Sequence, residues 1–267
     1  MEPIDFHAHF FPEPVAAKVV KTLADHYRIP VNHRGLKAEY LKLFAEAGLG
    51  AAVFFTAATR PDQVRAANDW ALANSGGHLI GFGTLHPHAE TAETEAEIAR
   101  LRAHGVKGLK FHPDFQRFYL DEERALAVYE RVAREFLVVF HVGDDEVPTK
   151  TNFATPERLA RVLDLVPGLQ VVAAHMGGYQ MWERAWRCLV GRPVYFDVSS
   201  TFGFLPDDEI REMILAHGVN RILFGSDYPF RSPGWELGRL RGLDLDRAAL
   251  EAVTGGNAKR LLATLGW

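Results

Sequence analysis

Leu137-Val138-Val139-Phe140-His141-Val142 is a short run, apolar except for one histidine, and Gly143 follows it directly. A run that is apolar on both faces is typical of a strand buried in a parallel sheet. Seven similar runs occur along the chain, spaced mostly by about 30 residues, the size of one strand, one helix and two loops. They are Ile4–Phe10, Ala51–Thr56, Leu79–Leu85, Val106–His112, Gln170–His175, Val194–Val198 and Arg221–Asp227.

The segments between these runs have the periodicity of amphipathic helices. In the clearest one, Thr155 is a helix cap and Pro156 suits the first helical position. One apolar face follows, made of Leu159, Val162, Leu163 and Val166, and a second helix has the stripe Leu126, Tyr129, Val132 and Phe136 after the acidic opening Asp121-Glu122-Glu123. Eight strands alternating with helices predict an α/β fold, a single-domain (β/α)8 TIM barrel over residues 1–267.

Two parts of the chain do not fit a simple strand-helix repeat. Residues from about Pro12 to Leu36 form a short insertion after the first strand, expected as an extra helix and loop near the barrel mouth and a candidate lid. The segments Arg247–Val253 and Asn257–Leu265 are expected to be helical.

Composition excludes several classes of protein. The chain has 267 residues, 48% of them hydrophobic, a formal net charge of −4 and one cysteine, Cys188. There is no basic footprint for nucleic acid, no polybasic membrane anchor, no intrachain disulfide and no thiolate cage. We expect a soluble, cytoplasmic protein with a small-molecule substrate and no nucleic-acid or membrane partner; whether it forms a homo-oligomer stays open.

Five ligand-type side chains collect where the predicted strands end. His7 and His9 are two residues apart, so on a strand both point to the same side. His141, His175 and Asp227 end three other runs, and the carboxyl ends of barrel strands share one rim. Imidazole and carboxylate ligands suit a divalent metal ion, zinc first, with manganese or iron as alternatives.

Of the 12 histidines, those other than His7, His9, His141, His175 and His112 need no special role. His86 and His88 flank Pro87 and are expected as loop residues at the rim, not ligands. Solvated surface is expected for His26, His33, His78, His104 and His217. Asp144 and Asp145 follow His141, where they either orient a ligand imidazole or cap a turn.

Aromatic residues gather around the mouths of the first and last strands. They either form an apolar pocket wall or pack the N-terminal insertion onto the rim, and packing is the favoured interpretation. The residues are Phe10, Phe11, Tyr228, Phe230 and Trp235.

The ordered set of motifs resembles a known family. Asp5-Phe6-His7-Ala8-His9, then His141, His175 and Gly225-Ser226-Asp227-Tyr228-Pro229, are similar to the amidohydrolase superfamily. The nearest branch is the amidohydrolase-related (amidohydrolase 2) branch, which includes aminocarboxymuconate-semialdehyde decarboxylase and the resorcylate decarboxylases. The resemblance runs from Ile4 to Pro229.

By this resemblance, His7, His9, His141 and Asp227 are metal ligands. Asp227 also handles the proton of the metal-bound water, and His175 polarises the substrate or shuttles protons. Superfamily members with two metals carry a carbamylated lysine on strand four, where this chain has Lys110. One ion is favoured and two are not excluded; an unmodified Lys110 would instead pair with a carboxylate or hold a substrate acid group.

His112 shares the strand-four face of Lys110 and is expected either to line the pocket or to serve only the turn at Pro113. The metal-dependent deoxyribonucleases resemble the chain too, but they place a glutamate on strand four, so a nuclease is disfavoured.

Three functions follow. The first is a metal-dependent hydrolase whose activated water attacks an amide, ester or lactone carbonyl, with His175 stabilising the oxyanion. The alternative is a non-oxidative decarboxylase (carboxy-lyase) of an unsaturated or aromatic carboxylic acid. The third is a catalytically idle metal-binding protein, which the intact ligand set argues against.

Overall fold

The computed structural model describes residues 2–143 and 152–266, and within them each apolar run forms a strand. The strands are shorter than the runs, because each run continues into the loop after its strand. Their bounds are β1 (Ile4–Ala8), β2 (Ala51–Phe55), β3 (Leu79–Phe82), β4 (Gly108–Phe111), β5 (Leu137–Phe140), β6 (Gln170–Ala173), β7 (Tyr195–Asp197) and β8 (Ile222–Leu223).

All neighbouring strands pair in parallel, as β1-β2-β3 and as β4-β5-β6-β7-β8. Backbone hydrogen bonds join the two sheets at both seams. Gly83 donates to Gly108 at 2.9 Å, and Phe6 donates to Phe224 at 2.8 Å. The sheet therefore closes into the predicted (β/α)8 barrel, a single-domain α/β fold.

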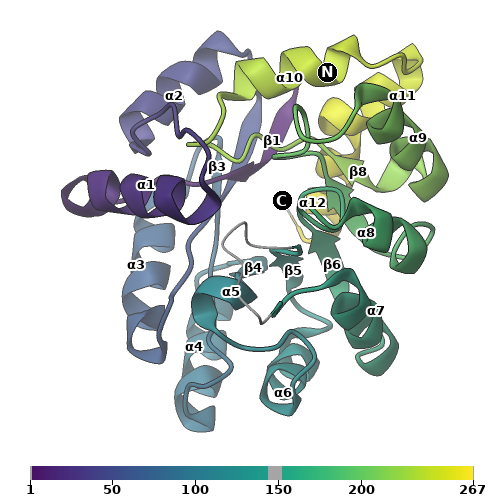
Figure 1. Ribbon diagram of the computed structural model, residues 1–267. Coiled ribbons are helices and arrows are strands. Elements are labelled where there is room, and N and C mark those ends of the chain that lie inside the picture. The colour runs from purple at the N-terminus through teal and green to yellow at the C-terminus, as the bar shows by residue number, and fades with distance from the viewer. Residues whose placement is uncertain (1, 144–151, 267) are drawn as a thin grey trace.

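Helices surround the barrel (Figure 1). Their bounds are α1 (Glu13–Tyr27), α2 (Lys37–Glu46), α3 (Val64–Asn74), α4 (Thr91–Ala103), α5 (Pro113–Gln116), α6 (Glu123–Val132), α7 (Pro156–Leu165), α8 (Trp182–Cys188), α9 (Asp207–His217), α10 (Pro233–Gly242), α11 (Arg247–Glu251) and α12 (Asn257–Thr264). A π-helical turn, Ala252–Gly256, joins α11 to α12 without a break, where two separate segments were predicted. None of the described helices has the length and apolar character needed to cross a lipid bilayer.

Local signals located α7 well and α6 less completely. Thr155 accepts a hydrogen bond from the Arg158 amide at 3.3 Å, as a helix cap does. Phe136, predicted as part of the α6 stripe, lies beyond the helix end at Val132, although it is still buried.

The N-terminal insertion packs onto the rim of the barrel, and α1 reaches toward the barrel axis (Figure 1). The Tyr27 ring at the end of α1 lies 5.5 Å from that of Phe230, and the His33 ring lies 5.5 Å from that of Tyr228. Packing of the insertion is thus the interpretation of the aromatic cluster that the structure favours. Trp235 is 39% exposed and takes little part.

The expectation that His217 is solvated is wrong. Its side chain is buried, its Nε2 lies 2.7 Å from the Val194 carbonyl oxygen, and its ring stacks on Phe196 at 3.8 Å. The last turn of α9 faces the barrel wall, which a count of histidines in helical context cannot show. His86 is buried as well.

Helix α10 buries a carboxyl group that has no hydrogen-bond partner in the described part of the chain. Glu236 is 0% exposed, and both of its carboxyl oxygens lack a partner. Burial raises its pKa well above 4.5, and the negative charges of Asp227 and Asp5 raise it further. Burial therefore favours the neutral acid form of Glu236 over its carboxylate, although Arg231 and Arg239 partly oppose the shift.

This predicts how Glu236→Gln changes stability with pH. A carboxyl pKa that is raised on folding contributes stability below pH 4.5, and that stability is lost as pH rises toward the folded-state pKa. Urea unfolding from pH 4 to 9 should show that the variant loses less stability at alkaline pH than the wild type. The exposed Glu130→Gln is the control, and parallel curves for wild type and Glu236→Gln would contradict the prediction.

Candidate metal centre

Three side chains, from the first strand and from the segments just after the first and last strands, meet at the mouth of the barrel. The Nε2 atoms of His7 and His9 lie 3.1 Å apart. Asp227 Oδ1 lies 3.5 Å from His7 Nε2 and 3.6 Å from His9 Nε2. Three of the four ligands expected from the sequence thus form one group, which we call the donor triad.

The protonation of His7 is set by a carboxylate on its other side. Its Nδ1 lies 2.9 Å from Asp197 Oδ2, so the ring proton belongs on Nδ1 and Nε2 keeps a lone pair. Burial lowers the pKa of His7 well below 6.5, and Lys110 and His175 lower it further. His7 is therefore a neutral imidazole that faces the triad with an acceptor atom.

The donor triad fits a divalent cation. Burial also lowers the pKa of His9 well below 6.5, so two imidazole lone pairs and a carboxylate oxygen converge without a positive charge of their own. Ligand atoms about 2.1 Å from a tetrahedral ion stand about 3.4 Å apart, close to the spacing of these three atoms.

His141, the fourth expected ligand, does not join the triad but lies beside it. The His175 Nδ1 is 3.1 Å from the Ser199 carbonyl oxygen, which places its proton there and leaves Nε2 as an acceptor. His141 Nδ1 lies 3.1 Å from that Nε2 and donates to it. His141 Nε2 is then a buried lone pair, with no hydrogen-bond partner among the residues described.

Asp197 and Ser199, at and just after the end of β7, escaped the sequence reasoning. Asp197 Oδ1 accepts from the backbone amides of His175 at 3.2 Å and Ser199 at 3.1 Å, while Oδ2 holds His7. One carboxylate therefore orients groups from three strands. The available signal was an aspartate inside an apolar run, near the end of a strand as His141 is in its own run.

Asp5, in the same motif as His7 and His9, connects β1 to the segment after β8. Its carboxylate accepts from the Ser226 amide at 2.9 Å, the Ser226 hydroxyl at 2.6 Å and the Tyr40 hydroxyl at 2.9 Å. Burial raises its pKa to about 6 despite these hydrogen bonds.

The backbone of Asp227 has a conformation that few non-glycine residues adopt. Its φ is 52°, and His175 has a φ of 59°, both in the left-handed region that non-glycine residues avoid. Such strain is concentrated at functional sites. The Ser200 hydroxyl donates to Asp227 Oδ2 at 2.6 Å, and burial raises the pKa of Asp227 to about 6.

Lys110 extends from β4 into the same space. Its Nζ lies 3.5 Å from His7 Nε2 and 4.9 Å from the centre of the Phe55 ring, and the side chain is 1% exposed. Burial lowers its pKa to about 8, partly offset by Asp197 and Asp227. No carboxylate within the described ranges comes within ion-pair distance of Lys110.

His112, just after β4, packs against His141. Its ring stacks on that of His141 at 4.0 Å, and its Nε2 lies 3.0 Å from the Tyr27 hydroxyl. Its Nδ1 also accepts from the Phe115 amide at 3.4 Å, so His112 caps α5 at the turn that begins with Pro113 and contacts the inserted helix α1.

The other candidates lie elsewhere. His86 Nδ1 accepts from the His88 amide and His88 pairs with Glu122 at 2.6 Å, so neither belongs to the triad. Asp144 and Asp145 lie outside the described residues.

Comparison with solved structures reproduces the fold. A 2,6-dihydroxybenzoate decarboxylase in complex with 2,6-dihydroxybenzoate superposes with a TM-score of 0.74 at 19% identity, covering 98% of this chain and 99% of that one. A dihydroxybenzoic acid decarboxylase from Polaromonas sp. JS666, with bound manganese and 2-nitroresorcinol, gives 0.73 at 17% identity with 98% and 97% coverage. A putative 2-pyrone-4,6-dicarboxylic acid hydrolase from Pseudomonas putida gives 0.68 at 19% identity with 98% and 97% coverage.

No curated protein matches the sequence. The model of the amidohydrolase family (Amidohydro_2) matches residues 4–264, nearly the whole length. The barrel with its donor triad thus belongs to a chain of the amidohydrolase 2 family.

Proposed function

We propose that this protein is a metal-dependent carboxy-lyase that removes carbon dioxide, without oxidation, from an aromatic or unsaturated carboxylic acid. The observation that carries the proposal is Lys110, a buried cation beside the donor triad with no carboxylate at ion-pair distance in the described chain. A buried charge without a partner is costly, so a substrate carboxylate is a fitting partner for Lys110. Hydrolase action was the first expectation from the sequence, and this reverses the order of the two.

The proposal includes one divalent ion, which His7, His9 and Asp227 would hold. His141 Nε2, a buried lone pair without a hydrogen-bond partner in the described chain, is the proposed fourth donor. Zinc is the first choice, and manganese is the alternative that the Polaromonas decarboxylase structure contains. When bound, the ion would supply positive charge that stabilises an anionic substrate oxygen. Neutral His7 and His9, oriented by Asp197 and by the Phe55 backbone, keep their lone pairs for it.

The side chains perform the remaining steps. Lys110 holds the substrate carboxylate, and the buried surroundings exclude water. The carbon–carbon bond to the carboxylate breaks, carbon dioxide leaves, and the electron pair stays on the substrate carbon. Asp227, whose pKa burial raises to about 6, is the proposed donor: its protonated carboxyl group gives its proton to that carbon, becomes a carboxylate, and takes up another proton from solvent before the next turnover. The Ser200 hydroxyl positions its carboxyl group.

Hydrolysis of a small ester, lactone or amide is the second candidate. Asp227, which is buried, lies near His7 and accepts a hydrogen bond from Ser200, is equally placed to accept a proton from water. The hydrolase among the similar folds acts, by its name, on a dicarboxylic acid, so Lys110 would again hold a carboxylate.

The two reactions are separated by following atoms. A decarboxylase should release carbon dioxide from a dihydroxybenzoate panel and, by microscopic reversibility, exchange a ring proton of resorcinol for deuterium in deuterated water, as seen by NMR. A hydrolase should instead incorporate oxygen-18 from labelled water into its product. Release of carbon dioxide with no incorporated label supports the proposal; labelled product with no carbon dioxide contradicts it.

Lys110→Met tests the carboxylate partner. Removing a buried charge that binds the substrate should lower kcat/KM by about 100-fold. Metal content, measured by elemental analysis, should remain at one equivalent per chain. The exposed Lys42→Met is the matched control and should keep full activity. If Lys110→Met loses its metal, Lys110 serves the metal instead; two equivalents in the wild type would favour a bridging, carbamylated Lys110.

Asp197→Asn tests the support of His7. Loss of the carboxylate that holds the Nδ1 proton should weaken metal binding by about 10- to 100-fold. Competition with a chelator measures this in the purified variant, whose folding circular dichroism can check. Asp208→Asn, an exposed change on α9, should bind metal like the wild type. Equal metal affinity in both variants would refute the role of Asp197.

A further inference from the structure

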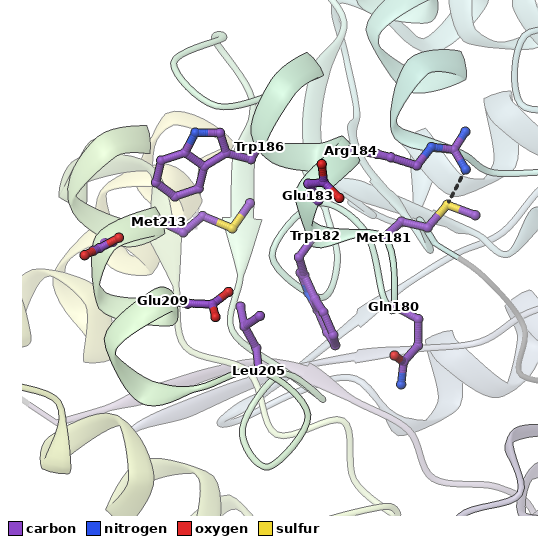
Figure 2. A pocket seen from close by; sticks show the side chains of 10 residues that line it. Gln180, Met181, Trp182, Glu183, Arg184, Trp186, Leu205, Glu209 and Met213 are labelled. Atoms are coloured by element: carbon purple, nitrogen blue, oxygen red, sulfur yellow. Dashed lines mark hydrogen bonds between the residues drawn. The ribbon is translucent and has the colours of Figure 1, made fainter.

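A second concave site lies on the outside of the barrel, along α8 and α9. It is a groove with a volume of about 550 Å³, within the range of small-molecule sites. Figure 2 shows its walls, with Trp186, Met213 and Glu209 on one side and Trp182 on the other. The lining residues are Gln180, Met181, Trp182, Glu183, Arg184, Trp186, Leu205, Glu209, Glu212 and Met213.

The walls of the groove are apolar and aromatic. Met181, Trp182 and Met213 are buried, so packing holds this part of the lining in place. Trp186 is 40% exposed and offers an indole face at the edge. A large exposed aromatic beside a preformed groove is the usual mark of a binding surface.

The charged side chains of the groove that have no ion-pair partner in the described chain are both acidic. Glu209 and Glu212 are neighbours on α9, and neither has an ion-pair partner within the residues described. Arg184 is engaged by Glu157 at 2.6 Å and also contacts the Met181 sulfur (Figure 2), while Glu183 pairs with Arg187 at 3.1 Å. In Figure 2 the Glu209 carboxylate points into the space between Leu205 and Met213.

We propose that this groove binds a small organic cation, an ammonium or guanidinium group that carries an apolar body. Trp186 would contact the cation through its ring face, Glu209 and Glu212 would balance the charge, and Met181, Met213 and Leu205 would receive the apolar part. This site is separate from the metal centre and does not depend on which reaction the metal centre performs.

A hydrogen bond connects Trp182 of the groove to His175, beside the metal centre. The Trp182 indole N–H donates to the backbone carbonyl of His175 at 3.0 Å. The Tyr179 ring lies 6.0 Å from both Trp182 and His175. Since His175 holds a left-handed backbone conformation and its ring binds His141, a ligand that shifts Trp182 acts directly on that pair. A cation bound in the groove would therefore act as an effector of the metal centre.

Calorimetry with benzyltrimethylammonium tests the binding. The cation should bind the intact protein, and the uncharged benzyl alcohol should bind at least about fivefold more weakly. Trp186→Ala and the double variant Glu209→Gln/Glu212→Gln should each weaken cation binding by about two- to fivefold. The exposed Glu130→Gln should not change it.

Equal affinity for the cation and the alcohol, or no loss in the double variant, would overturn the proposal. So would concentration-dependent self-association that buries Trp186, because a second copy of the chain would then occupy the groove.

NMR of the histidine side chains tests the coupling. Benzyltrimethylammonium should shift the ring resonances of His175 and His141. Trp182→Phe keeps an aromatic ring but loses the indole N–H, so it should bind the cation yet lose these shifts. Binding without any shift in the wild type would reduce the groove to a site without effector action and so refute the coupling.

Discussion

The site depends on the seam where β1 meets the chain that follows β8. Asp5, buried within β1, accepts hydrogen bonds from the amide and hydroxyl of Ser226, and the His9 amide donates to the Tyr228 carbonyl at 2.8 Å. The seam brings residues more than 200 positions apart in sequence into contact. His7 and His9 stand on one side of it and Asp227 on the other, so closing the barrel also assembles the triad.

Burial then sets the chemistry of the assembled groups. It lowers the pKa of His7, His9 and His141 and raises that of Asp227. Every shift is toward the neutral form, because the low-polarity interior disfavours charge. The imidazoles of His7 and His9 and the carboxylate of Asp227 converge in the donor triad, and a bound cation would stabilise all three together. The same burial makes Lys110 receptive to an acidic substrate.

Hydrogen bonds that cross the barrel link the two proposals. The Asp197 carboxylate accepts from the His7 ring and from the His175 backbone amide, and the His175 carbonyl accepts from the Trp182 indole N–H. His175, whose backbone has a left-handed conformation, therefore lies between the metal centre and Trp182 of the outer groove. A small displacement at α8 has a short path to the pair of His175 and His141.

Local signals in the sequence determined the secondary structure and the fold class. Eight apolar runs marked eight strands, and Thr155 with Pro156 located the start of α7, because strand burial and helix capping are written in adjacent residues. The pair His7 and His9 was visible for the same reason, since alternation along a strand is a local property.

Only the tertiary structure decided which side chains come into contact. That His141 bonds to His175 instead of joining the triad, that Asp197 supports His7, and that His217 is buried against Phe196 all depend on contacts between distant segments. The direction of a side chain at a strand end and the loop that covers it are set by packing among neighbouring strands and helices. No pattern within one segment carries that information.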